Sequence, residues 1–123
     1  MKPFVLIVDD EFGLAEMSGE LLVEDGFEVA IAINGKLGLE VMASRDVALV
    51  LTDLMMPVMD GPEMIRRMRA DPRFARIPVI LMTALPEAIP SASESLHDVL
   101  LVKPFSVREL IENARRLTGH CPP

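Results

Sequence analysis

Short runs of consecutive apolar residues recur along the chain and predict buried β-strands. The first run, Phe4–Val8, contains five apolar residues with no polar alternation, which is typical of a strand covered on both faces. The runs at 48–51 and 79–82 have the same character, and those at 27–32 and 99–102 are weaker examples. Their spacing leaves room for a helix between consecutive strands.

The longer segments between these runs carry apolar residues three and four positions apart, as amphipathic helices do. Helix ends are predicted where a capping or turn residue borders such a stripe. These signals are a stop at Asp25-Gly26, starts at Asn34-Gly35, Gly61-Pro62 and Ser106, and a stop at Gly119. The segment 85–97 differs, because two prolines interrupt it and its apolar residues form no stripe. We expect a short or irregular helix there.

Strands that alternate with helices predict an α/β domain with a parallel sheet, right-handed crossovers and helices on both faces. The length of 123 residues suits one domain. We expect it to span residues 1–123, with a core at about 3–118 and a tail or the start of a linker at 119–123.

The net charge of −7 argues against direct nucleic-acid binding, which needs a concentrated basic patch. The arginines of segment 66–76 are expected to form a solvated helix face and loop. No apolar run approaches the roughly 20 residues that cross a bilayer, so no membrane contact is predicted and a cytoplasmic location is expected. The single cysteine, Cys121, excludes a disulfide within the chain.

Chemically informative residues follow four of the five apolar runs. In open parallel sheets, ligands bind outside the carboxyl ends of the strands, so these residues are expected to share one edge. They are Asp9 and Asp10 after the first run, Asp53 after the third, Thr83 after the fourth and Lys103 after the fifth.

Such a concentration of carboxylates is unfavourable unless a cation accompanies it. Two carboxylates about 4 Å apart repel by about 4 kcal/mol at an effective dielectric constant near 20. Mg²⁺ prefers carboxylate oxygens and retained waters, so the edge is predicted to hold a divalent cation, Mg²⁺ or Mn²⁺. Asp53 then suits a nucleophile that forms an aspartyl-phosphate. Thr83 and Lys103 would contact the phosphoryl oxygens.

Four motifs carrying these residues together resemble the receiver domain of two-component response regulators over nearly the whole chain. They are Val8-Asp9-Asp10-Glu11, the run from Thr52 to Gly61, Met82-Thr83-Ala84 and Val102-Lys103-Pro104-Phe105. The resemblance implies a flavodoxin-like, doubly wound, five-stranded sheet with strand order 2-1-3-4-5.

The resemblance also implies the role of each site residue. Asp53 would accept a phosphoryl group from a phosphohistidine of a sensor histidine kinase or phosphotransfer protein, or from a small donor such as acetyl phosphate. Mg²⁺ would be held by Asp9, Asp10 and Asp53 and by the backbone carbonyl of Met55. Thr83 and Lys103 would contact the phosphoryl group, and Lys103-Pro104 would be a cis peptide.

The implied function is a phosphorylation-dependent switch of protein–protein contacts. Its target would be a downstream protein or a missing C-terminal output domain, and a homodimer is possible. The domain would not be a conventional enzyme, because it catalyses only its own phosphorylation and a slow dephosphorylation. Two alternatives are a receiver-fold adaptor that is not phosphorylated and a haloacid-dehalogenase-like phosphatase. The phosphatase fits less well, because that family places Asp-x-Asp after its first strand, whereas Asp9 and Asp10 are adjacent.

Two positions depart from the usual receiver pattern. Leu100 stands where such domains commonly carry Tyr or Phe, so an aromatic rotation cannot transmit the signal here. Met55 and Leu85, two residues beyond the acceptor and the threonine, are both apolar. Since neither would orient an attacking water molecule, we expect a long-lived phosphorylated form.

Overall fold

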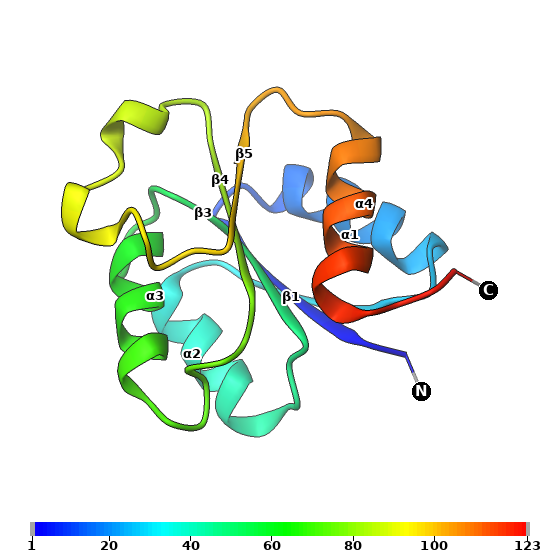
Figure 1. The fold of residues 1–123 in the computed structure, drawn as a ribbon, viewed down its shortest axis with the longest axis horizontal. Coiled ribbons are helices and arrows are strands. Elements are labelled where there is room, and N and C mark those ends of the chain that lie inside the picture. Colours follow the sequence, from blue (N-terminus) through cyan, green and yellow to red (C-terminus); the bar gives the residue numbers. More distant parts are fainter. Residues whose placement is uncertain (1, 123) are drawn as a thin grey trace.

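The computed structural model describes residues 2–122, which form a five-stranded parallel sheet of order β2-β1-β3-β4-β5 (Figure 1). The predicted fold class and the strand order implied by the resemblance are therefore confirmed. The strands are β1 (Phe4–Val8), β2 (Glu28–Ala32), β3 (Leu49–Asp53), β4 (Val79–Thr83) and β5 (Val99–Val102). The helices are α1 (Phe12–Glu24), α2 (Gly35–Ser44), α3 (Gly61–Ala70) and α4 (Val107–Thr118).

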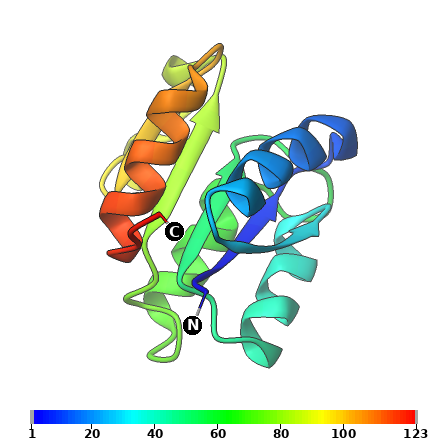
Figure 2. The same ribbon diagram turned by 90° about the vertical axis from the view of Figure 1, so that its right-hand side faces the viewer.

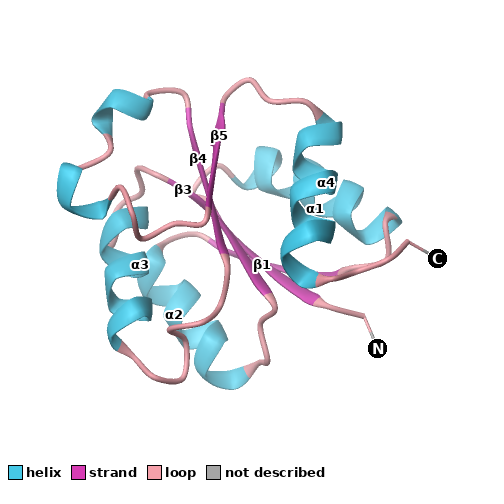
Figure 3. Ribbon diagram, in the orientation of Figure 1, coloured by secondary structure: helices cyan, strands magenta, loops and turns pink. Residues whose placement is uncertain are grey.

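Helices cover both faces of the sheet, as Figures 1 and 2 show. Helices α1 and α4 lie on one face, and α2 and α3 lie on the other (Figure 3). Alternate residues of each strand therefore enter two separate cores: Leu6 and Val8 pack with α2 and α3, whereas Val5 and Ile7 pack with α1 and α4. Burial on both sides explains why the central strands are apolar without alternation.

The predicted helix boundaries depend on specific caps. Ser106 and Glu109 form a reciprocal capping box at the start of α4, and Gly119 ends it in the left-handed conformation at φ 70°. The side chains of Asn34 and Asp60 accept backbone hydrogen bonds at the starts of α2 and α3. Each N-terminal cap satisfies an amide that the helix itself cannot.

The connection between β4 and β5 contains two 3-10 turns, Pro86–Ala88 and Ser91–Ser93, in place of an α-helix. This confirms the irregular segment expected from its prolines. Ile89 holds the segment against the sheet, since its side chain is buried in the core shared with α2 and α3.

Arg69 also holds this segment, so the expectation that all five arginines would be solvated was wrong at this position. From the last turn of α3, its guanidinium donates to the carbonyls of Ala75, Ile77 and Leu96 and to the carboxylate of Asp98. The backbone carbonyls of two irregular segments thus gain a charged donor where no helix satisfies them.

Over the described residues, no helix is long and apolar enough to cross a bilayer.

Candidate functional site

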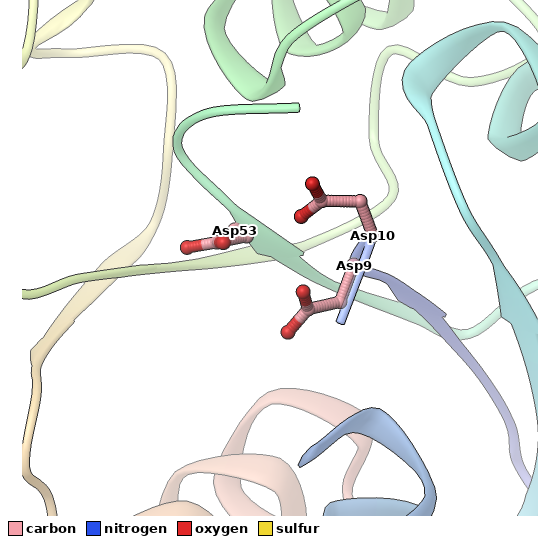
Figure 4. Close-up of side chains that lie close together, drawn as sticks. All are labelled: Asp9, Asp10 and Asp53. Carbon is pink, nitrogen blue, oxygen red and sulfur yellow. The ribbon is translucent and has the colours of Figure 1, made fainter. Parts of the chain in front are cut away.

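Three carboxylates meet at the carboxyl edge of the sheet. Asp9 and Asp10 directly follow β1, and Asp53 is the last residue of the neighbouring strand β3. Because Val8 pairs with Thr52 in the sheet register, the two strands end at the same level. One oxygen from each of Asp9, Asp10 and Asp53 lies within 4.8 Å of the others (Figure 4). The structure therefore brings the three predicted metal-binding carboxylates together.

Backbone groups hold two of these carboxylates in place. The amide of Glu11 donates to Oδ1 of Asp9 at 2.9 Å, and the amide of Leu54 donates to Oδ1 of Asp53 at 3.0 Å. The hydroxyl of Thr52 donates to the backbone carbonyl of Asp53 at 2.9 Å. Such fixed donors orient a carboxylate and stabilise its charge.

Asp9 is the most enclosed of the three, with only 3% of its surface exposed. Burial raises the pKa of its carboxyl above the ordinary value, and the nearby charges of Asp53 and Asp10 raise it further. The hydrogen bond from Glu11 and the charge of Lys103 act in the opposite direction. Burial is thus the main reason that the charged form of Asp9 is disfavoured, and the neighbouring carboxylates add to it.

Thr83 is the last residue of β4, and Lys103 directly follows β5. The side-chain ammonium of Lys103 lies 3.3 Å from Oδ1 of Asp53. The backbone amide of Lys103 donates a hydrogen bond to the carbonyl of Thr83 at 2.8 Å. The Thr83 hydroxyl oxygen accepts a hydrogen bond from the backbone amide of Leu85 at 2.9 Å. The Lys103-Pro104 peptide is cis, as the resemblance implied. All the predicted site side chains therefore lie along one edge.

The loop after Asp53 is tightly constrained. Gly61 donates its amide to the carbonyl of Leu54, and a side chain at Gly61 would overlap the carbonyl oxygen of Asp53. Val58 has a φ of 70°, a conformation that β-branched residues rarely adopt. Met55, whose carbonyl is the predicted fourth metal ligand, carries a side chain that is 67% exposed.

The donor set fits a hard divalent cation. It consists of carboxylate oxygens only. They come from a buried residue, Asp9, an exposed one, Asp10, and a partly buried one, Asp53. Mg²⁺ is commonly held by one or two carboxylates together with water and a phosphate group. Because the edge is buried at Asp9 and open at Asp10, it can hold carboxylate ligands and still admit water and a phosphate group.

Thr52 was not among the predicted site residues, although its hydroxyl holds the backbone of Asp53. Its side chain is fully buried, and it pairs with Val8 of β1. The available signal was its position, since it is the one polar residue inside an otherwise apolar run and directly precedes Asp53. A buried hydroxyl needs a hydrogen-bond partner, and here that partner is the carbonyl of Asp53.

Comparisons with known proteins agree with this geometry. The family model described as "Response regulator receiver domain" matches residues 5–115. Sensor histidine kinase TmoS of Ectopseudomonas mendocina is 39% identical over 112 residues, which are 89% of this chain and 11% of that protein. DNA-binding response regulator MtrA of Mycolicibacterium paratuberculosis is 34% identical over 94% of this chain and 51% of its own length. The chain thus spans about half or less of these relatives.

A solved structure also resembles the chain along its whole length. It is the receiver domain of sensor histidine kinase PA1611 from Pseudomonas aeruginosa, with a TM-score of 0.84 and 25% identity. The match covers 98% of this chain and 100% of that one. That structure is described as having a magnesium ion coordinated in its active site cleft.

Proposed function

Because the chain belongs to the response regulator receiver domain family, we propose that it accepts a phosphoryl group on Asp53 and thereby switches protein–protein contacts. The donor would be a phosphohistidine of a sensor histidine kinase or phosphotransfer protein, or a small donor such as acetyl phosphate. One observation carries the proposal: three carboxylates lie within 4.8 Å of one another, with an ammonium 3.3 Å from Asp53.

The residues that would hold Mg²⁺, or Mn²⁺, are Asp9, Asp10 and Asp53 together with the backbone carbonyl of Met55. When bound, the ion would neutralise negative charge on the carboxylates and on the phosphoryl group. The carboxylate cluster is the support for this assignment. The magnesium ion described for the PA1611 receiver domain gives independent support.

The chain's own residues then account for the transfer. A carboxylate oxygen of Asp53 attacks phosphorus, a P–O bond forms, and the P–N bond to the donor histidine breaks. The departing imidazole nitrogen keeps the bonding electron pair and takes a proton from water. The ammonium of Lys103, which pairs with Asp53 before the reaction, is then available to a phosphoryl oxygen. The Thr83 hydroxyl accepts a hydrogen bond from the Leu85 amide and can use its own proton to donate to another phosphoryl oxygen.

The new charge explains how the domain would act as a switch. The phosphoryl group carries a charge of about −1.5 to −2 beside Lys103 and Thr83, in place of the single negative charge of the Asp53 carboxylate. Groups that interact with it more strongly in one conformation shift the equilibrium toward that conformation. Turnover of a separate substrate is not part of this role, so the domain is not a conventional enzyme. Its target would be a downstream protein or an output domain attached to the same chain.

An apolar cavity beside the site suits the approach of a donor protein. It has a volume of about 330 Å³ and lies between α1 and α4, where Asp9 and Lys103 contribute to its wall. Leu14 and Met17 of α1 line the cavity and are largely exposed. A partner that brings a phosphohistidine to Asp53 would bury these side chains, which would favour docking.

Phosphorylation can be tested by incubating the protein with Mg²⁺ and acetyl phosphate and measuring its intact mass. We expect the mass of one phosphoryl group to be added to the wild-type protein and to be absent from Asp53→Asn. Asp46→Asn is the matched control, because it removes a carboxylate far from the cluster and should leave the addition intact. Absence of any addition would favour the adaptor alternative. Release of phosphate from a generic phosphomonoester would favour a phosphatase.

A further inference from the structure

Strand β2 forms one margin of the sheet, and the structure defines which of its backbone groups are free. The amide of Glu28 donates to Pro3 and the carbonyl of Ala32 accepts from Asp9, so both residues face β1. Backbone groups of successive residues point to opposite edges of a strand. The amides and carbonyls of Val29 and Ile31 therefore point away from the sheet, where no strand among residues 2–122 pairs with them.

Open grooves flank this margin on both faces. On one side Phe12, Gly19 and Val23 of α1 form a groove with Val29 and Ile31. On the other side the groove is formed by β2 together with Ile33, Leu37 and Val41. Phe12 is 55% exposed and Ile33 is 49% exposed, so large apolar surface borders the free backbone on both faces.

The charge on the α1 side of the margin is of one sign, whereas Arg45 pairs with Glu28 at the start of β2. Every charged side chain from residue 9 to residue 35 is acidic. Glu16, Glu20 and Glu24 line the groove on the α1 side, whereas the groove on the α2 side has Glu40 as its one charged side chain among the described residues. The α1 side is thus suited to basic groups and the α2 side to apolar ones.

We propose that β2 is a docking edge for an extended segment of a partner protein that alternates basic and apolar residues. Such a segment would add a sixth strand, with main-chain hydrogen bonds to Val29 and Ile31. Because successive side chains of a strand point to opposite faces, alternation directs every basic side chain to the α1 glutamates and every apolar one to the α2 groove. The apolar stems of Lys or Arg can cover Phe12 and Val23.

The charge also argues against a second copy of the chain at this edge. Pairing two β2 strands would bring the α1 glutamates of one copy close to those of the other. Like charges opposite each other destabilise strand pairing, and edge strands commonly use charge to prevent self-association. A basic partner gains from the same glutamates. The acidic margin therefore selects for a partner of opposite charge.

Amide hydrogen exchange tests the proposal residue by residue. The probe is a capped seven-residue peptide that alternates lysine and valine, added with excess Mg²⁺ to keep its lysines from the carboxylate cluster. We expect exchange at Val29 and Ile31 to slow by about tenfold or more. The Ala30 amide points toward β1 and should not change, which also reports that the sheet is intact in each variant. Unchanged exchange at Val29 and Ile31 would overturn the proposal.

Modified peptides separate strand addition from simple charge attraction. Methylating the backbone amides of the lysines removes hydrogen-bond donors from one edge of the peptide. Methylating the backbone amides of the valines removes them from the opposite edge. One of the two peptides should lose binding and the other should keep it, whereas equal binding of both would contradict strand addition. A peptide with glutamate in place of lysine should not bind.

Two protein variants complete the test. Glu20→Lys should weaken binding of the lysine–valine peptide by about two- to fivefold, the size expected of one exposed ion pair. Glu94→Lys makes the same charge change in the segment between β4 and β5 and should leave the affinity unchanged. Equal weakening by both variants would show that only the net charge matters and would overturn the assignment to β2.

Discussion

Lys103 Nζ lies 3.3 Å from Oδ1 of Asp53, and the two side chains are only 29% and 17% exposed. The ammonium is therefore part of the carboxylate cluster and offsets some of its charge. It also stands close to any divalent cation bound there, which it would repel. Lys103 has two opposite effects on the site: it stabilises the metal-free edge, and it opposes metal binding.

Replacing Lys103 with methionine separates these effects. We expect Lys103→Met to bind Mg²⁺ about tenfold more tightly, about 1.4 kcal/mol, because a nearby like charge has been removed. Phosphorylation by acetyl phosphate should nevertheless become slower, since the phosphoryl oxygens lose their cationic partner. Mg²⁺ affinity can be measured from the unfolding free energy, which should rise by about 1.4 kcal/mol at ten times the dissociation constant. Lys36→Met, outside the cluster, should change neither property.

A glycine determines the shape of the loop that follows Asp53. Gly61→Ala places a methyl group against the carbonyl oxygen of Asp53, and hydrogen bonds constrain the backbone at both positions. We expect a loss of about 1–3 kcal/mol in unfolding free energy. Gly13→Ala is the control, since its side chain would meet nothing within 4 Å and should stabilise α1 by about 0.5–1 kcal/mol. Equal stability of both variants would contradict the close approach.

Much of the site could be predicted because short sequence patterns determine it. The apolar runs locate the strands, and the strand ends locate Asp9, Asp53, Thr83 and Lys103 on one edge. The irregular connection between β4 and β5 followed from its prolines. These features depend on residues close together in the chain, where spacing and capping determine the local structure.

Other features could not be predicted, because they depend on residues far apart in the chain. Arg69 contacts Leu96 and Asp98, and nothing in the local pattern of α3 distinguishes it from the exposed Arg66. Asp25 likewise pairs with Arg115, ninety positions away. The pattern located a helix end at Asp25 but gave no sign of this ion pair, because tertiary contacts follow from packing and not from periodicity.

Val58 adopts a conformation that stores strain in the loop after Asp53. Its φ of 70° disfavours a β-branched side chain, and the side chain is 78% exposed, so packing does not compensate. We expect Val58→Asn to raise the unfolding free energy by about 1 kcal/mol, since asparagine tolerates the left-handed region. Val58→Ala keeps Cβ and should gain less. Chemical denaturation measures both, and a destabilised asparagine variant would show that Val58 contributes packing.

The ion pair between Asp25 and Arg115 makes stability depend on pH. Hydrogen bonds from Arg115 hold the pKa of the Asp25 carboxyl below its ordinary value of 3.8, and the charge of His120 acts in the same direction. A lowered pKa stabilises the folded state above pH 3.8, and this stabilisation is lost as the pH falls through the lowered value. Asp25→Asn should therefore be less stable than wild type at pH 7, and the difference should shrink below pH 4.

Denaturant unfolding at several pH values between 7 and 2.5 measures that difference. Glu24→Gln is the control, because Glu24 makes no ion pair among residues 2–122. Its unfolding free energy should stay close to that of the wild type across the range. If the difference between Asp25→Asn and wild type were constant with pH, the carboxylate would not be the stabilising species.

The lifetime of the phosphorylated form depends on whether water can be oriented near Asp53. Met55 and Leu85 are both exposed, yet neither side chain has a strong hydrogen-bonding group. We therefore expect phosphorylated protein, once separated from the donor, to decay over minutes or longer, and Met55→Asn to decay faster by about tenfold, within the range that one positioned polar group provides. Met17→Asn, an equally polar change on an exposed position of α1, should leave the rate unchanged. Following the intact mass in time measures all three proteins, and a wild-type form lost within seconds would show that other groups orient the water.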